Sequence, residues 1–394
     1  MNLPVLLGQM ALVLSAIGIG LVFVIYPLCI LLIGVIARRP LASGDARPGS
    51  VSLITVVRNG GLLILDKIEN TFSLSVAGEL EMIVFSDGST DDTNQIVKDH
   101  AGAGLKIIAS ADHQGKNSGL NRAAEAASGE ILVFSDADAL LDEEALIFLT
   151  RPFTDPRVGG VCGQRVIGER SRTLGRAQKD YIKFDSTIKV LETRAGSISS
   201  NDGKLYAVRK GLFQPVPAAV TDDSYSGLSI VRQGYRFIFE PRAKAFIRTP
   251  SRNPWHEIGR RRRIVTRSLT GIRLMKALLN PLDYGVFSCS LFINKVCRRM
   301  LPLFLILLLI GSAGLAGRHG PYALFLVLQL ACYGLALAHP VLNRFGWSWR
   351  PLDRVSGAAF YFCVGNIGTF LGLMDFLRGR QVVKWQPAKT DVSV

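Results

Sequence analysis

The sequence predicts an α/β protein with a mainly parallel sheet, joined to α-helical transmembrane segments. Between residues 50 and 240, short apolar runs alternate with helical patterns, and long uncharged apolar runs flank this region on both sides. Compact apolar runs are typical of strands buried on both faces of a parallel sheet, and about 20 apolar residues are enough to cross a bilayer. The six cysteines are dispersed without Cys-x-x-Cys spacing, which argues against a zinc site or a disulfide framework.

The first apolar run, Leu3 to Ala37, contains no formally charged residue and ends in Arg38-Arg39. A cleaved signal peptide would have a shorter apolar core followed by a small-residue cleavage site. We therefore expect a retained anchor in residues 1–39. The positive-inside tendency places the Arg pair and the domain that follows in the cytoplasm, so an inner-membrane protein is expected.

Alternating strands and helices are expected in the domain that follows, which we place at residues 50–280. The predicted strands are Ser52–Val57, Met82–Phe85, Leu105–Ala109 and Ile131–Phe134, and the predicted helices are Gly61–Ser75, Asp91–Ala101, Lys116–Ser128 and Asp142–Thr150. This alternation is typical of nucleotide-binding α/β sheets, in which ligands bind outside the carboxyl ends of the strands. Polar residues at those ends are therefore the first candidates for a site.

Acidic residues follow two of the predicted strands. Asp87 comes after the second strand, where its carboxylate can accept hydrogen bonds from a base or ribose; a plain strand-to-helix turn is the alternative. Asp136 and Asp138 follow the fourth strand, and two carboxylates spaced by one residue can converge on Mg²⁺ or Mn²⁺. A cation held in this way keeps open positions for phosphate oxygens, whereas acids that are only solvated are the alternative.

Two further motifs carry candidate residues. Lys116 begins a predicted helix, whose N-terminal N–H groups would help it to meet a diphosphate; a surface lysine is equally compatible with the pattern. Thr221-Asp222-Asp223 follows a Gly- and Ser-rich stretch and supplies a candidate general base. A solvated loop is the alternative for the two adjacent acids.

The net charge of +15 is concentrated in one region of the chain. Residues 51–240 hold 21 basic and 25 acidic residues, a charge of −4, whereas residues 241–300 hold 14 basic and two acidic residues, a charge of +12. Four consecutive arginines, Arg260 to Arg263, are compatible with nucleic-acid binding, a solvated helix face or phosphate recognition. No base-reading module is recognisable beside them, so no nucleic-acid partner is expected.

On a helix, Arg260, Arg263 and Arg267 would share one face, where they could neutralise a leaving diphosphate. Arg261 and Arg262 would then face the anionic surface of the membrane.

The end of the chain predicts a membrane region. An amphipathic interfacial helix is expected at 281–299, followed by two to three spans in residues 300–377, and the candidate spans are Leu301–Gly317, Gly320–Val341 and Val355–Met374. The last candidate is interrupted by glycines, so a re-entrant or interfacial segment is the alternative. Three spans would place the basic tail at 378–394, with Arg378, Arg380 and Lys384, outside the cell, against the positive-inside tendency.

The ordered set of motifs resembles the membrane-bound family-2 glycosyltransferases, whose core is similar in cellulose, hyaluronan and chitin-oligosaccharide synthases. The resemblance covers about Val51 to Arg299 and the flanking spans. It implies a GT-A-type nucleotide-sugar-binding domain with a UDP-sugar donor. It also implies a lipid-linked saccharide or glycan as acceptor, membrane lipids as surroundings, and partners in a polysaccharide assembly or export system.

The resemblance also assigns roles to residues. Thr55 and Asp87 would bind the nucleotide, Lys116 would lie near the diphosphate, and Asp136 with Asp138 would hold the cation. The final acid of the TED motif, here Asp223, matches the catalytic base.

One motif departs from the family pattern. The QxxRW motif of processive synthases is replaced by Arg260 to Ile264, in which Arg263 matches the retained arginine. Loss of the tryptophan removes an aromatic platform for the polymer, which counts against processive extrusion. The arginine-rich segment resembles that of an exopolysaccharide-type branch of the family.

The reaction implied by this resemblance is inverting transfer of a sugar, with Asp223 as the base and Arg260 and Arg263 opposite the departing diphosphate. Three alternatives stay open: a processive synthase that extrudes its product, an inactive membrane scaffold, and a transporter or channel subunit with a regulatory nucleotide domain. Intact acids at all motif positions argue against the scaffold. The small number of polar residues in the predicted spans argues against the channel.

Overall fold

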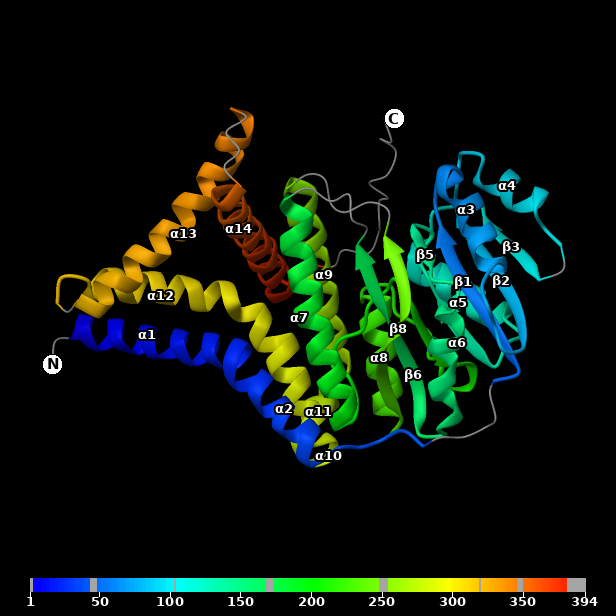
Figure 1. Ribbon diagram of the computed structural model, residues 1–394, viewed down its shortest axis with the longest axis horizontal. Helices are drawn as coiled ribbons and strands as arrows, with labels where there is room; N and C mark the ends of the chain where they lie inside the picture. The colour runs from blue at the N-terminus through cyan, green and yellow to red at the C-terminus, as the bar shows by residue number, and fades with distance from the viewer. Residues whose placement is uncertain are drawn as a thin grey trace.

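The computed structural model describes residues 3–42, 48–102, 104–167, 173–247, 254–318, 320–345 and 350–380. Eight strands form one mixed sheet in the order β3-β2-β1-β4-β7-β6-β8-β5 (Figure 1). The strands are β1 Ser50–Val57, β2 Glu79–Asp87, β3 Leu105–Ser110, β4 Ile131–Phe134, β5 Ala139–Leu141, β6 Val158–Ile167, β7 Tyr206–Arg209 and β8 Arg236–Ile247. The first four strands pair in parallel, which confirms the predicted mainly parallel sheet.

Three of the predicted strands, β1, β2 and β4, are buried on both faces, as their continuous apolar runs require, whereas β3 lies at the edge of the sheet and is partly exposed. Successive residues of β1 alternate between two cores: Ile54 packs in one and Leu53 in the other. The helices of this domain are α3 Gly61–Phe72, α4 Thr93–Asp99, α5 Lys116–Ala126, α6 Ala145–Thr150, α7 Thr173–Ala195, α8 Asp222–Arg232 and α9 Pro254–Leu274. Residues of α3 and α6 belong to one core, and residues of α5, α8 and α9 belong to the other.

Antiparallel strands complete the sheet, and the sequence did not predict them. β7 pairs antiparallel with β4 on one side and with β6 on the other, while β5 pairs antiparallel with β8. The pairing of β4 with β7 matters most for the site, because it places the residues that precede β7 beside the residues that follow β4.

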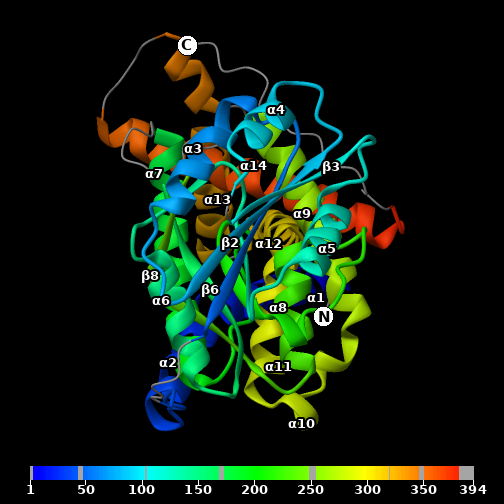
Figure 2. The same cartoon turned by 90° about the vertical axis from the view of Figure 1, so that its right-hand side faces the viewer.

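Four helical runs in the described residues are long and apolar enough to cross a membrane: Leu3–Ile36, Val286–Leu315, Gly320–Arg344 and Pro351–Leu377. They contain α1 Leu3–Gly20, α2 Tyr26–Ile36, α11 Val286–Leu291, α12 Leu301–Leu315, α13 Gly320–Arg344 and α14 Arg350–Leu377, and the short helix α10 Pro281–Tyr284 precedes α11. They lie to one side of the sheet, with α7 and α9 between (Figure 1), and α12 is seen almost end-on behind the domain in Figure 2.

The predicted interfacial helix at 281–299 differs in the structure. Residues 286–315 form one helical run, interrupted only by π- and 3₁₀-turns at 292–300. Its cations contact the sheet domain. Lys295 Nζ donates to Ser200 Oγ at 2.7 Å, and an Arg299 N–H donates to Ser268 Oγ at 2.7 Å. These hydrogen bonds attach the apolar helix to the domain.

The last candidate span is one continuous helix, and its glycines do not interrupt it. The glycines that suggested an interruption allow α14 to lie close to α9: a Cβ on Gly368 would meet the Ile258 carbonyl oxygen at 2.9 Å, and one on Gly372 would meet that of Arg262 at 2.6 Å. The end of α14 therefore lies beside the sheet domain, and Arg380 pairs with Asp375 near that end. Lys384 lies outside the described residues.

This close contact predicts a size limit on α14. Replacing Gly368 with Ile should lower the free energy of unfolding by about 3 kcal/mol, because the new side chain overlaps the backbone of α9. Thermal unfolding of the detergent-solubilised protein measures the change. The control is Gly334→Ile in α13, where a Cβ meets nothing within 4 Å, and equal melting temperatures for the two variants would contradict the prediction.

Candidate active site

The carboxyl ends of β2, β1 and β4 lie side by side, and the predicted residues at these ends are buried. Thr55 is fully buried near the end of β1, where its hydroxyl donates to the Ser135 carbonyl oxygen at 3.0 Å. The predicted contact of Thr55 with a nucleotide stays a prediction. In the structure, Thr55 holds the turn that follows β4.

Asp87 fixes the loop that leads to Lys116. Its carboxylate accepts hydrogen bonds from the backbone N–H groups of Gln114 at 2.7 Å and Gly115 at 2.9 Å. His113 Nδ1 lies 2.9 Å from the same carboxylate, a contact that the sequence did not predict. Asp87 is 1% exposed, and these contacts use its carboxylate to hold the loop; its predicted contact with a nucleotide stays a prediction.

Lys116 and Asp136 are 20 positions apart in the sequence, and the structure brings these two predicted site residues into contact. Lys116 Nζ lies 2.8 Å from Asp136 Oδ1 and 2.9 Å from Asp222 Oδ2, so it joins the start of α5 to the turn after β4 and to α8. Burial alone would raise the pKa of Asp136, but Lys116 and Lys204 outweigh burial and hold that pKa far below its usual range. Asp136 is therefore a carboxylate at any pH at which the protein would work.

Lys204 was missed by sequence reasoning. Its Nζ lies 2.9 Å from Asp136 Oδ2 and 2.8 Å from Asp138 Oδ1. The register of the sheet explains this contact, because β4 and β7 pair Phe134 with Tyr206, and continuing that register by two residues places Lys204 opposite Asp136. Only the unpredicted antiparallel pairing of β7 could have signalled it.

A second unpredicted lysine lies beneath these carboxylates. Lys67 of α3 is fully buried, and its Nζ donates to Ser135 Oγ at 2.8 Å and to the Ala139 carbonyl oxygen at 2.6 Å. Burial lowers the pKa of Lys67 to about 7, although Asp136 and Asp138 oppose this effect. Lys67 thus supports the turn that carries both acids.

The donor atoms in this turn fit a hard divalent cation that binds together with phosphate. Asp136 and Asp138 each direct one oxygen at the same point, which Lys204 Nζ occupies. Within the described ranges no group of three His, Cys, Asp or Glu side chains could hold a metal. Mg²⁺ typically takes one or two carboxylates and completes its coordination with water and substrate phosphates, so two acids suffice only if a ligand supplies the rest.

Asp223 lies at the start of α8 with the properties of a general base. Burial and the neighbouring charge of Asp222 raise the pKa of Asp223 to about 6, which is close to neutrality. Its Oδ1 accepts a hydrogen bond from the Ser224 N–H at 2.7 Å. Gly203, which precedes Lys204, lies against the Asp223 side chain and leaves space beside it.

The arginines of α9 point in different directions. Among the described residues, Arg263 has no hydrogen-bond or ion-pair partner, and burial together with Arg267 and Arg260 lowers its pKa to about 10, while Asp222 and Asp136 oppose the shift. Arg260 instead pairs with Glu257 through two hydrogen bonds of 2.8 and 2.9 Å. Arg263 is therefore the better placed of the two predicted diphosphate ligands.

The other arginines hold neighbouring segments. Arg261 donates to Glu257 at 2.8 Å and to Tyr361 Oη at 2.6 Å, and Arg262 pairs with Asp375 of α14. Both side chains contact α14, while that of Arg262 is still 42% exposed, so the prediction that Arg261 and Arg262 face the membrane surface stays a prediction. Arg267 donates to the Val220 carbonyl oxygen at 3.0 Å and so fixes the loop that leads to α8.

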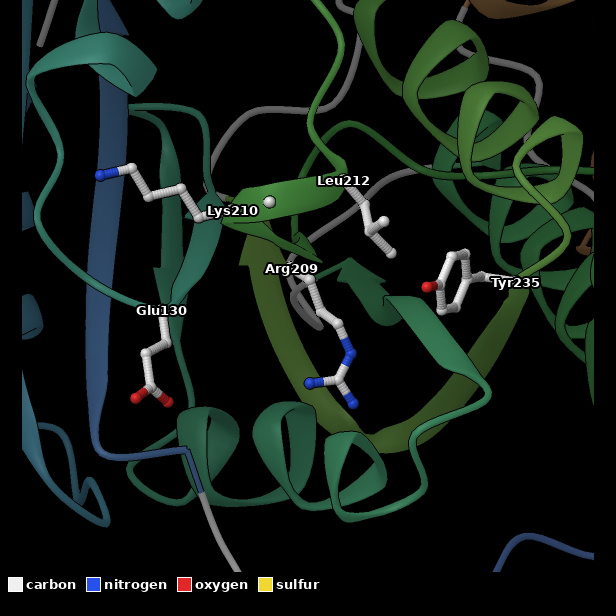
Figure 3. Close-up of a pocket in the computed structure, with 6 residues that line it drawn as sticks. Glu130, Arg209, Lys210, Leu212 and Tyr235 are labelled. Atoms are coloured by element: carbon white, nitrogen blue, oxygen red, sulfur yellow. The ribbon is translucent and has the colours of Figure 1, made fainter.

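A shallow depression at the other end of β4 is a poor candidate for the site. Glu130, Arg209, Lys210, Leu212 and Tyr235 line it, with Gly211 (Figure 3). The Arg209 side chain donates to the carbonyl oxygens of Val158 and Phe153, and Lys210 donates to that of Ala127. These cations stabilise backbone at the amino end of β4, away from the acidic residues.

The comparison with protein families decides what kind of domain this is. The model of glycosyl transferase family 2 matches residues 52–214. These residues are similar to glycosyl transferase family 2 domains. The resemblance inferred from the motifs is confirmed, and the matched range contains Asp87, Lys116, Asp136, Asp138 and Lys204.

Curated relatives agree with this family. The chain is 26% identical over 220 residues to the poly-beta-1,6-N-acetyl-D-glucosamine synthase of Staphylococcus aureus (strain COL), covering 54% of this chain and 53% of that protein. It is 27% identical over 207 residues to the synthase of the same name from Staphylococcus epidermidis, covering 51% and 50%. The chain thus spans about half the length of the curated relatives it matches.

A solved structure shares the fold of nearly the whole chain. This is a mannosyltransferase from Pyrobaculum calidifontis, solved in complex with GDP-Man and Mn2+, with a TM-score of 0.69 and 23% identity. The match covers 95% of this chain and 100% of that one, so it includes membrane-length helices as well as the sheet domain. It confirms the predicted GT-A-type fold.

The buried pairing of Glu257 predicts a loss of stability when it is removed. Burial would raise the pKa of Glu257, but Arg260 and Arg261 lower it to about 2. Glu257→Leu should therefore lower the free energy of unfolding by about 3 kcal/mol at neutral pH, because two arginines lose their carboxylate. Since the folded-state pKa is depressed, the contribution is complete above about pH 4.3 and is lost as pH falls toward 2.

Thermal unfolding at pH 7 of Glu257→Leu and of Glu125→Leu, a change at an exposed helical position, measures this effect. A Glu257→Leu melting temperature equal to that of the control would contradict it.

Proposed function

We propose that this chain is an inverting glycosyltransferase that moves a sugar from a nucleotide donor to a lipid-linked saccharide or a growing polysaccharide. The observation that carries the proposal is one charged cluster. Lys116 pairs with Asp136 and with Asp222, the neighbour of Asp223, and Arg263 lies within electrostatic reach of Asp136 and Asp222. Anion-binding groups and a base of raised pKa at the same sheet edge are the components that transfer from a diphosphate needs.

In the proposed reaction, the Asp223 carboxylate takes the proton of an acceptor hydroxyl as its oxygen attacks the anomeric carbon. The bond from that carbon to the diphosphate oxygen breaks, and the diphosphate leaves with the electron pair. Lys116 and Arg263 offset the charge that grows on it. A divalent cation bound by Asp136 and Asp138 would supply further electrostatic stabilisation of the same oxygens.

The relatives support the substrate class. Their name as poly-beta-1,6-N-acetyl-D-glucosamine synthases favours a glycan acceptor, whereas the mannosyltransferase structure contains GDP-Man. We propose UDP as the nucleotide, with Mg²⁺ or Mn²⁺ as the cation. The four apolar helical runs favour a place in the inner membrane, with the sheet domain in the cytoplasm.

A donor screen tests this proposal. Membranes that contain the protein should release nucleoside diphosphate from one of a set of UDP- and GDP-sugars and label a lipid or polymer fraction, whose product length separates single addition from processive synthesis. Membranes with Asp223→Asn should retain about normal donor binding and lose turnover by a factor of at least about 10³. Transfer at the native rate by Asp223→Asn would contradict the assignment of the base.

The pH dependence provides an independent check. Because Asp223 must be ionised to accept a proton and its pKa is about 6, kcat/KM should fall as pH decreases through 6 and level off above about pH 7. Initial rates from pH 5 to 8 at saturating cation measure the profile. Rates that stay constant across this range would show that another group accepts the proton.

A further inference from the structure

The ammonium group of Lys204 lies where the cation of the proposed donor site belongs. Its Nζ is 2.8 Å from Asp138 Oδ1 and 2.9 Å from Asp136 Oδ2. These two oxygens belong to different side chains, so the single ammonium group bridges both acids. The positive charge of Lys204 therefore satisfies the same pair of carboxylates that a divalent cation would use.

The position of Lys204 is fixed by its backbone. The Ser135 hydroxyl donates to the Lys204 carbonyl oxygen at 3.1 Å, and the Lys204 N–H donates to Asp202 Oδ1 at 3.2 Å. Ser135 immediately precedes Asp136, so the loop before β7 and the turn after β4 are held together by backbone contacts as well as by the side chain. The Cα of Lys204 would stay in place if its ammonium group moved.

Lys116 differs from Lys204 in a way that matters here. It contacts the other oxygen of Asp136, Oδ1, and its second partner is Asp222 and not Asp138. A cation between Asp136 Oδ2 and Asp138 Oδ1 would leave both contacts of Lys116 intact. The same cation would take both partners of Lys204, whose flexible four-carbon side chain is 21% exposed.

We propose that Lys204 is a resident counter-ion of the Asp136–Asp138 pair and is displaced when a divalent cation arrives together with the donor diphosphate. This inference rests on the proposed function, because that function makes the two acids the cation ligands. Its consequence is an order of binding. The cation binds weakly to the protein alone and tightly when the diphosphate supplies the remaining oxygen ligands, so the paired acids do not bind free metal ions ahead of the donor.

Mn²⁺ binding to the full-length protein in detergent or nanodiscs, without any sugar donor, tests the inference by electron paramagnetic resonance of the free ion. The Lys204→Met variant, which keeps the length of the side chain without its charge, should bind Mn²⁺ at least about tenfold more tightly than the native protein. Lys204→Arg keeps the charge and should bind as weakly as the native protein. Asp138→Asn combined with Lys204→Met should lose the gain, which places the ion between the two acids.

The native protein gives a second measurement that does not depend on any variant folding. Addition of UDP or GDP should tighten Mn²⁺ binding by about tenfold or more, and this increase should be smaller in Lys204→Met. Equal or weaker Mn²⁺ binding by a folded Lys204→Met variant would overturn the inference. So would tight Mn²⁺ binding by the native protein without nucleotide.

A third result would also overturn it. If the native protein binds nucleotide as tightly with a chelator as with Mn²⁺, and Lys204→Met loses that binding, Lys204 is a permanent substitute for the metal. Because all these measurements are made without turnover, failure of sugar transfer in the donor screen leaves their outcome unaffected. Failure of the Mn²⁺ measurements likewise does not affect the assignment of Asp223 as the base, which the donor screen tests separately.

Discussion

Two lysine side chains hold the carboxylate of Asp136, one at each oxygen, and the arrangement of the site depends on this contact. Lys116 comes from the first turn of α5, and Lys204 comes from the loop before β7. Through Asp222, Lys116 also reaches the start of α8. Buried charges are stable only when they are paired, so segments that are far apart in the sequence are positioned together by one carboxylate.

The same requirement explains the arginine-rich helix α9. Its buried Glu257 pairs with Arg260 and Arg261, and Asp375 of α14 pairs with Arg262. Each pair takes a positive charge away from the cleft and uses it to hold a neighbouring segment. Arg263, which stays unpaired among the described residues, is the arginine that lies within electrostatic reach of Asp222 and Asp136. Only part of the charge of +12 counted in residues 241–300 is balanced by acids outside that range, among them Asp375.

The sequence predicted the parallel half of the sheet well, because strands buried on both faces must be continuously apolar. β4, predicted at Ile131–Phe134, has those bounds in the structure. Strand ends then located Asp87, Asp136 and Asp138. A residue's place at a strand end does not show which way its side chain points. Thr55 was expected to bind the nucleotide, and in the structure its hydroxyl donates to the turn after β4.

What could not be predicted depends on neighbours that are distant in the sequence. The contact of Lys204 with Asp136 follows from the antiparallel pairing of β7 with β4, and no local pattern before β7 reveals its partner. Helical periodicity placed Arg261 and Arg262 away from the face of Arg260 and Arg263. It could not show that α14 supplies their partners, Tyr361 and Asp375.

The glycines of α14 set a rule for how this chain can vary through evolution. Where α14 faces lipid, one apolar side chain can replace another with little effect, so sequence drift there should be rapid and uninformative. At Gly368 and Gly372 a single added carbon meets the backbone of α9, so a small side-chain volume is what must be conserved at these positions. In relatives that retain this helix pair, the small residues of the last helix should persist after most of its hydrophobic sequence has changed.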